Sequence, residues 1–124
     1  MGSLRFCFAQ SAVINHDKNG KTIVFGNKKL KVGVDYNKKA NIYFLEINGQ
    51  QVIQRNAGIY SMICTKDATY STLHLFSDPS INASGNTIRV TGIQYGDKLV
   101  TIQETWIFTV TNNNIKLDLE RTLS

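Results

Sequence analysis

The fold is decided by residues 99–123, which are LVTIQETWIFTVTNNNIKLDLERTL. Apolar side chains hold alternate positions in the first part of this stretch: Val100, Ile102, Trp106, Phe108 and Val110. They hold alternate positions again after an asparagine-rich turn: Ile115, Leu117, Leu119 and Leu123. Because successive side chains of a β-strand point to opposite faces of the sheet, this period of two predicts a β-hairpin with one buried face.

Shorter runs of the same character lie between this hairpin and the N-terminus, separated by turn-forming residues. We expect strands at residues 4–9, 22–25, 30–36, 41–47, 50–55, 59–65, 70–76, 87–95, 99–110 and 115–122. Asn48-Gly49 is the strongest hairpin signal, since both residues tolerate the positive φ that a type I′ turn requires. Gly33 indicates a bulge or a close backbone approach. Residues 77–85, which contain the one proline, are expected to form the longest loop.

These signals predict an all-β protein, an antiparallel β-sandwich of about ten short strands with a meandering topology. A lipocalin-like or fatty-acid-binding β-barrel with an apolar cavity is the alternative. The length of 124 residues suits one domain, which we place at residues 4–124. Residues 1–3 are typical of a start added for expression, so a secretory signal peptide could have preceded them. No apolar run approaches the ~20 residues of a membrane-spanning helix.

The net charge of +5 is concentrated in the first third of the chain. Residues 1–40 carry eight basic and two acidic side chains. Lysines at turns most often serve as solvated residues that discourage sheets from pairing edge to edge. A groove for nucleic acid would interleave aromatic and basic residues, and only Phe25 and Tyr36 are available here. We therefore expect no nucleic-acid partner, although an acidic glycan stays open as an anionic partner.

The cysteines and histidines do not form a recognisable cofactor motif. Cys7 and Cys64 match neither a zinc-site spacing nor a redox C-x-x-C motif, and free buried cysteines are the default expectation. A Cys7–Cys64 disulfide in an oxidising compartment is the alternative. His16 and His74 lack neighbouring ligands at a suitable spacing. No metal or other cofactor is expected.

The carboxylates of the closing hairpin indicate a structural pair rather than a catalytic one. Asp118 and Glu120 lie on the polar face of a regular strand, where carboxylates are usually just solvated. Glu104 instead interrupts the apolar row of the first strand, and Arg121 interrupts the facing row of the second. Because an unpaired buried carboxylate is costly, we predict a Glu104–Arg121 ion pair across the hairpin. No catalytic residues are predicted, so the chain is not expected to be an enzyme by itself.

Exposed aromatic rings that stack on sugars would give the chain a binding function. The candidates for such a ligand site are Tyr60, Tyr70, Tyr95 and Trp106. Core packing is the competing interpretation, and the alternation favours it for Trp106. Tyr95 stands beside the Gly96-Asp97 turn and is the better candidate for an exposed ring.

The closing hairpin, from Thr101 to Leu123, resembles the hairpins of N-terminal β-sandwich (supersandwich) domains of bacterial glycoside hydrolases. This resemblance implies a non-catalytic domain of a periplasmic or extracellular bacterial protein, which binds sugar or supports a neighbouring catalytic domain. Carbohydrate or an adjacent catalytic domain is then the expected partner. A binder of small apolar ligands and a structural or assembly module are the alternatives. An exposed aromatic would favour the first function, an internal cavity the second, and a long unpaired sheet edge the third.

Overall fold

The computed structural model describes residues 11–54 and 56–124, and all regular structure in them is β-strand. The strands are β1 (Ala12–Asp17), β2 (Thr22–Gly26), β3 (Leu30–Asp35), β4 (Asn41–Ile47), β5 (Gln50–Gln51), β6 (Met62–Cys64), β7 (Thr69–Ser71), β8 (Ser80–Ser84), β9 (Thr87–Gly96), β10 (Thr101–Val110) and β11 (Ile115–Leu123). The expected all-β class is therefore confirmed. The strand expected at residues 4–9 lies outside the described residues.

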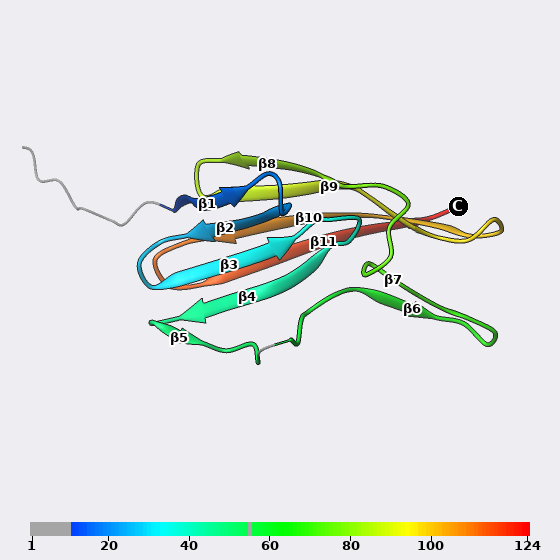
Figure 1. The fold of residues 1–124 in the computed structure, drawn as a ribbon, viewed down its shortest axis with the longest axis horizontal. Helices are drawn as coiled ribbons and strands as arrows, with labels where there is room; N and C mark the ends of the chain where they lie inside the picture. The colour runs from blue at the N-terminus through cyan, green and yellow to red at the C-terminus, as the bar shows by residue number, and fades with distance from the viewer. Residues whose placement is uncertain (1–10, 55) are drawn as a thin grey trace, which may run out of the picture.

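Three antiparallel sheets make up the described structure, and within each sheet neighbouring strands are consecutive in the chain. The first has the order β1-β2-β3-β4-β5, the second β11-β10-β9-β8, and the third is the small β6-β7 hairpin. The first two sheets stack on each other as a sandwich (Figure 1). None of the described sheets closes into a barrel. The meandering sandwich predicted from the turn spacing is thus the observed arrangement.

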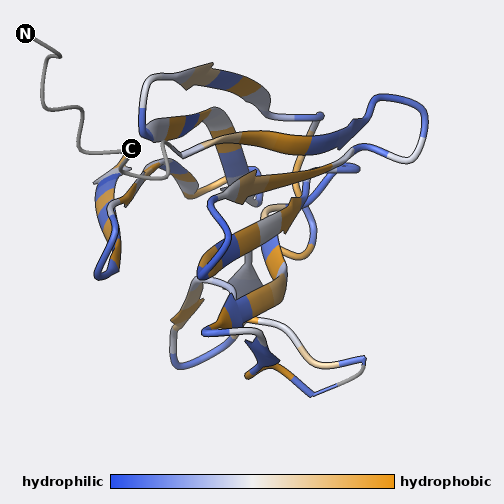
Figure 2. Ribbon diagram, turned by 90° about the vertical axis from the view of Figure 1, so that its left-hand side faces the viewer, coloured by the Kyte–Doolittle hydropathy of each residue, from blue (hydrophilic) through white to orange (hydrophobic). Residues whose placement is uncertain are grey.

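The core lies between the two large sheets and is built from the inward rows of β2, β3, β9 and β10. Apolar and polar residues alternate along these strands (Figure 2). The largest fully buried apolar side chains are Trp106, Tyr95, Phe25, Phe108, Ile23, Ile88, Ile93 and Ile102. Burial of this kind, at ~25 cal/mol per Å² of apolar surface, is the main force that holds the two sheets together.

The strongest sequence signals coincide with the structure. Residues Asn48 and Gly49 have φ values of 52° and 80°, as a type I′ turn between β4 and β5 requires. The partners in the β10–β11 pair run without a shift from Ile102 opposite Leu123 to Val110 opposite Ile115. Gly33 combines both predicted features, because the β3–β4 register shifts beside it and an added Cβ would lie 2.8 Å from Cβ of Phe44.

Other expectations need correction. Residues 80–84, expected in a loop, form β8, because Ser80–Ser84 pair with Thr87–Thr91 of β9. No strand was expected at residues 12–17, but Ala12–Asp17 form β1, which pairs with β2 in a hairpin. The strands expected at 50–55, 59–65 and 70–76 are much shorter, since long loops replace their ends. The β4 strand is nearly all apolar, which is typical of a strand covered on both faces, but the structure leaves it mostly half-buried.

A bulge in β9 changes which of its residues face the core. Val90 is opposite Trp106 and Ile93 is opposite Glu104, so β9 has one more residue than β10 in this interval. The extra residue is accommodated at Gly92, whose φ is +73°. Even-numbered residues of β9 face inward before the bulge and odd-numbered residues face inward after it.

Candidate functional site

A buried carboxylate, Glu104, lies at the centre of a polar cluster in the sandwich. Its side chain is fully buried, and four residues donate hydrogen bonds to it. Oε1 accepts from Nε1 of Trp106 at 2.9 Å. Oε2 accepts from the Ser61 hydroxyl at 2.7 Å, from Nε of Arg121 at 3.1 Å and from the Tyr95 hydroxyl. We call Ser61, Tyr95, Glu104, Trp106 and Arg121 the carboxylate cluster.

The ion pair between Glu104 and Arg121 is present, and the two residues are direct partners in the β10–β11 register. Burial alone raises the pKa of Glu104, but the hydrogen bonds and the Arg121 charge outweigh burial and leave this pKa below its ordinary value. Burial, followed by the hydrogen bond to Glu104, raises the pKa of Tyr95 to about 12. The cluster therefore holds an ionised carboxylate beside a neutral phenol at neutral pH, with both carboxylate oxygens occupied by donors.

The structure corrects the expected exposure of Tyr95. The ring is completely buried because the β9 bulge reverses the alternation and turns this residue toward the core. Trp106 is buried as well, as its position in the apolar row indicates. Neither ring can offer a face to a sugar in this conformation. Ser61 was missed by the sequence analysis, since nothing in the local pattern connects it with Glu104.

The other two aromatic candidates lie outside the carboxylate cluster. Tyr60 is 40% exposed, just before β6, and Tyr70 is half-buried on β7. The Tyr70 hydroxyl donates to the Asp97 carboxylate. This bond, aided by the backbone N–H groups of Val100 and Leu99, lowers the pKa of Asp97. Tyr70 is therefore tied to the β9–β10 turn, and Tyr60 is the freer of the two rings.

The second notable feature is the outer edge of the four-stranded sheet. Among the described residues, no strand pairs with the far side of β11. Its inward row remains open to solvent although the equivalent row of β10 is buried: Leu117 is 38% exposed, Leu119 41% and Leu123 63%. Apolar residues exposed in a row along a long strand edge are the features by which a sheet accepts another strand.

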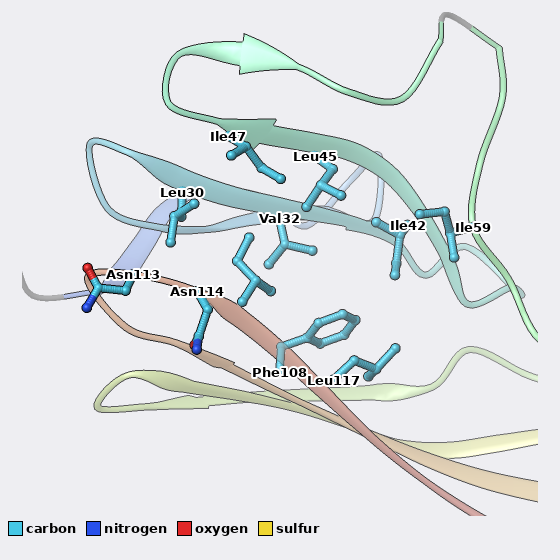
Figure 3. Close-up of a pocket in the computed structure, with 11 residues that line it drawn as sticks. Leu30, Val32, Ile42, Leu45, Ile47, Ile59, Phe108, Asn113, Asn114 and Leu117 are labelled. Carbon is cyan, nitrogen blue, oxygen red and sulfur yellow. The ribbon is translucent and has the colours of Figure 1, made fainter.

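An apolar groove of about 440 Å³ lies beside this edge, between β3–β4 of one sheet and β10–β11 of the other (Figure 3). Its lining is aliphatic apart from Phe108 and two turn asparagines: Leu30, Val32, Ile42, Leu45, Ile47, Ile59, Phe108, Asn113, Asn114, Ile115 and Leu117. We call the groove and the outer edge of β11 together the open side of the sandwich. The open side explains why β4 is only half-buried.

Other chemistry is limited within the part of the chain that the structure describes. No three His, Cys, Asp or Glu side chains gather there as a metal site would require. Cys64, expected to be buried, is exposed because β6 belongs to the small hairpin outside the core. Cys7 lies outside the described residues. No helix long and apolar enough to cross a membrane occurs in residues 11–54 and 56–124.

Comparisons with protein-family models, curated proteins and solved structures returned no match for this chain.

Proposed function

We propose that this chain is a non-catalytic β-sandwich module whose open side binds an extended polypeptide strand and so joins the module to another domain or chain. The observation that carries this proposal is the edge of β11, a strand of nine residues whose apolar row faces solvent beside the groove. Of the three functions weighed from the sequence, a long unpaired edge favours the assembly module.

The chemistry of the open side favours a strand over a sugar. A sugar site needs flat aromatic faces and several directed polar groups, whereas the groove is aliphatic and contains one aromatic ring, Phe108. A docked strand would satisfy the outward backbone groups of β11 with main-chain hydrogen bonds. Its alternate side chains would enter the groove and cover Ile115 and Leu117.

A small apolar ligand fits the open side less completely. It would fill part of the groove, but it would leave the outward N–H and C=O groups of β11 to solvent. The groove is also bordered by this exposed edge rather than enclosed within one sheet. An apolar ligand therefore accounts for the groove and not for the edge.

The wider setting of the proposal comes from the resemblance of the closing hairpin to supersandwich domains. In that setting the module supports the catalytic domain of a bacterial carbohydrate-processing protein, in the periplasm or outside the cell. Sugar binding is the weaker form of the proposal, because two of its four aromatic candidates are buried in the carboxylate cluster. Only Tyr60 and Tyr70 remain for it.

The test uses a fluorescent peptide, Lys-Thr-Ile-Thr-Ile-Thr-Ile-Thr-Lys, whose apolar residues alternate as a docked strand requires. We expect saturable binding by fluorescence anisotropy, and at least tenfold weaker binding to the Leu117→Lys variant. Leu99→Lys is the matched control, because Leu99 is 89% exposed and lies outside the groove. A peptide of the same composition without the alternation should bind weakly.

Three results would overturn the proposal. One is an absence of saturable binding, and another is equal binding of the two peptides. The third is unchanged binding to the Leu117→Lys variant. A fatty-acid probe that competes for the groove while the peptide does not bind would assign the open side to an apolar ligand instead. Far-UV circular dichroism of each variant establishes that it is folded.

A further inference from the structure

We propose that the strand bound by the open side is β11 of a second copy of this chain, paired antiparallel about a twofold axis at Leu117. This inference rests on the proposed function and names the partner. The result would be one continuous sheet of eight strands, formed from two four-stranded sheets. Twofold pairing of identical edges is the simplest closed assembly, because each copy offers the same surface to the other.

The face of the sheet limits the registers that such a pair can adopt. The exposed apolar residues of β11 point toward the inner side of the sandwich, and Lys116, Asp118 and Glu120 point outward. A partner strand must place its apolar row on the same side, since a slip by one residue would move the whole row to the other face. The twofold axis must therefore pass through a residue of β11 rather than between two residues.

Charge then selects one register. With the axis at Leu117, Lys116 lies opposite the partner's Asp118, and the symmetry repeats this pair on the other side. An axis at Lys116 would place two lysines opposite each other. An axis at Asp118 would place two aspartates opposite each other, although it would also pair Lys116 with the partner's Glu120 on both sides. An axis at Leu119 would put Asp118 opposite the partner's Glu120. Like charges directly opposite each other destabilise a pair of strands, so only the register at Leu117 avoids this cost among the four.

The same register also pairs the apolar residues. Leu117 meets the partner's Leu117, and Ile115 meets the partner's Leu119. Leu117 and Leu119 are 38% and 41% exposed in the single chain, so both have apolar surface to bury. Ile115 and Leu117 also line the groove, which places the new contact beside β4. A β-bulge or a proline would hinder pairing at a strand edge. The β10–β11 register is unshifted and β11 contains no proline, so β11 has neither of these features.

Lys116 is the lysine of this edge, and a lysine on an edge strand ordinarily discourages pairing. Within the single chain Nζ of Lys116 lies 3.7 Å from Oδ2 of Asp118, and both side chains are more than half exposed. An exposed ion pair of this kind contributes little to stability. In the proposed dimer each charge gains a cross-strand partner of opposite sign. The residue that would repel most other strands thereby favours a second copy in this register.

The test is a charge-exchange experiment followed by light scattering after size-exclusion chromatography. We expect the unmodified chain to dimerise with rising concentration. Lys116→Asp and Asp118→Lys each create two like-charged pairs across the axis, and each variant should dimerise about tenfold more weakly. An equimolar mixture of the two variants should recover the dimer, because every cross-strand pair is then complementary. Lys66→Asp reverses an exposed charge outside the open side and is the matched control.

The outcomes separate this inference from the proposed function. The partner is not a second copy if the chain stays monomeric at millimolar concentration. The same conclusion follows if the chain dimerises and neither single variant weakens the dimer. Failure of the mixture to recover the dimer overturns the register. If the chain is monomeric and still binds the alternating peptide at Leu117, the proposed function stands without this inference. If it is monomeric and binds no peptide, both are wrong.

Discussion

Replacing Glu104 by glutamine measures what the carboxylate cluster contributes to stability. The amide has nearly the same size, but it has one accepting oxygen. If that oxygen takes the three donors that meet Oε2, the amide nitrogen faces the indole N–H of Trp106, and two donors oppose each other. One charge-assisted hydrogen bond is then lost, and Arg121 keeps an accepting oxygen but loses the negative charge that balanced its own. We expect the free energy of unfolding to fall by about 3 kcal/mol at pH 7.

The pH dependence of this difference provides a second measurement. The pKa of Glu104 in the folded protein lies below its ordinary value of 4.5. Below pH 4.5 the unfolded chain therefore binds more protons than the folded one at this position. The stabilising contribution is fully present above pH 4.5 and is lost as the pH falls toward the folded-state pKa. The glutamine variant has no proton to exchange, so its deficit should shrink in acid.

Urea unfolding followed by the fluorescence of Trp106, the one tryptophan, reports on both effects. We expect the large difference at pH 7 and a clearly smaller one near pH 3.5, with the midpoint of thermal unfolding lower by roughly 12 °C at pH 7. Glu120→Gln is the control, because that carboxylate is exposed on β11. The reasoning is refuted if the Glu104→Gln variant is as stable as the unmodified chain. It is also refuted if the loss in free energy of unfolding does not change with pH.

Three further predictions concern single positions. Tyr95→Phe should lower stability by about 1–2 kcal/mol through the lost hydroxyl donor, whereas Tyr60→Phe should change it by less than ~0.5 kcal/mol; thermal unfolding of both variants checks this. Gly26→Ala should cost several times more than Gly85→Ala in urea unfolding, because an added Cβ would lie 2.0 Å from a backbone oxygen at the first position and would meet nothing within 4 Å at the second. Cys64 should react rapidly with a maleimide in the folded protein, as measured by mass spectrometry, because it is exposed; protection from labelling would indicate that its sulfur is covered or bonded.

The closing hairpin could be predicted in detail because its signals are local. The alternation from Val100 to Val110 and the turn at Asn112–Asn114 set the register, and the register places Glu104 opposite Arg121. The cost of burying a lone carboxylate then indicates an ion pair. The same local reasoning identifies the Asn48-Gly49 turn.

Features that depend on distant contacts could not be predicted in this way. Ser61 joins the carboxylate cluster through a loop that approaches β10 only in the folded chain. The bulge at Gly92 has a weak signal in the sequence, namely a glycine within an apolar run, and without it the alternation from Ile88 would turn Tyr95 outward. Ser80–Ser84 has too few apolar residues to indicate a strand, and its pairing with β9 creates β8.

The bulge at Gly92 also sets how this gene can change without loss of the fold. Removing the codon of Gly92 would give β9 simple alternation, with Ile88, Val90, Ile93 and Tyr95 all on the core face. Glu104 would keep its Tyr95 donor, and the core would keep both large side chains. The bulge is therefore the place where β9 can lose one residue and keep its core row, whereas a deletion outside the bulge, between Ile88 and Tyr95, would remove part of that row or turn it away from the core.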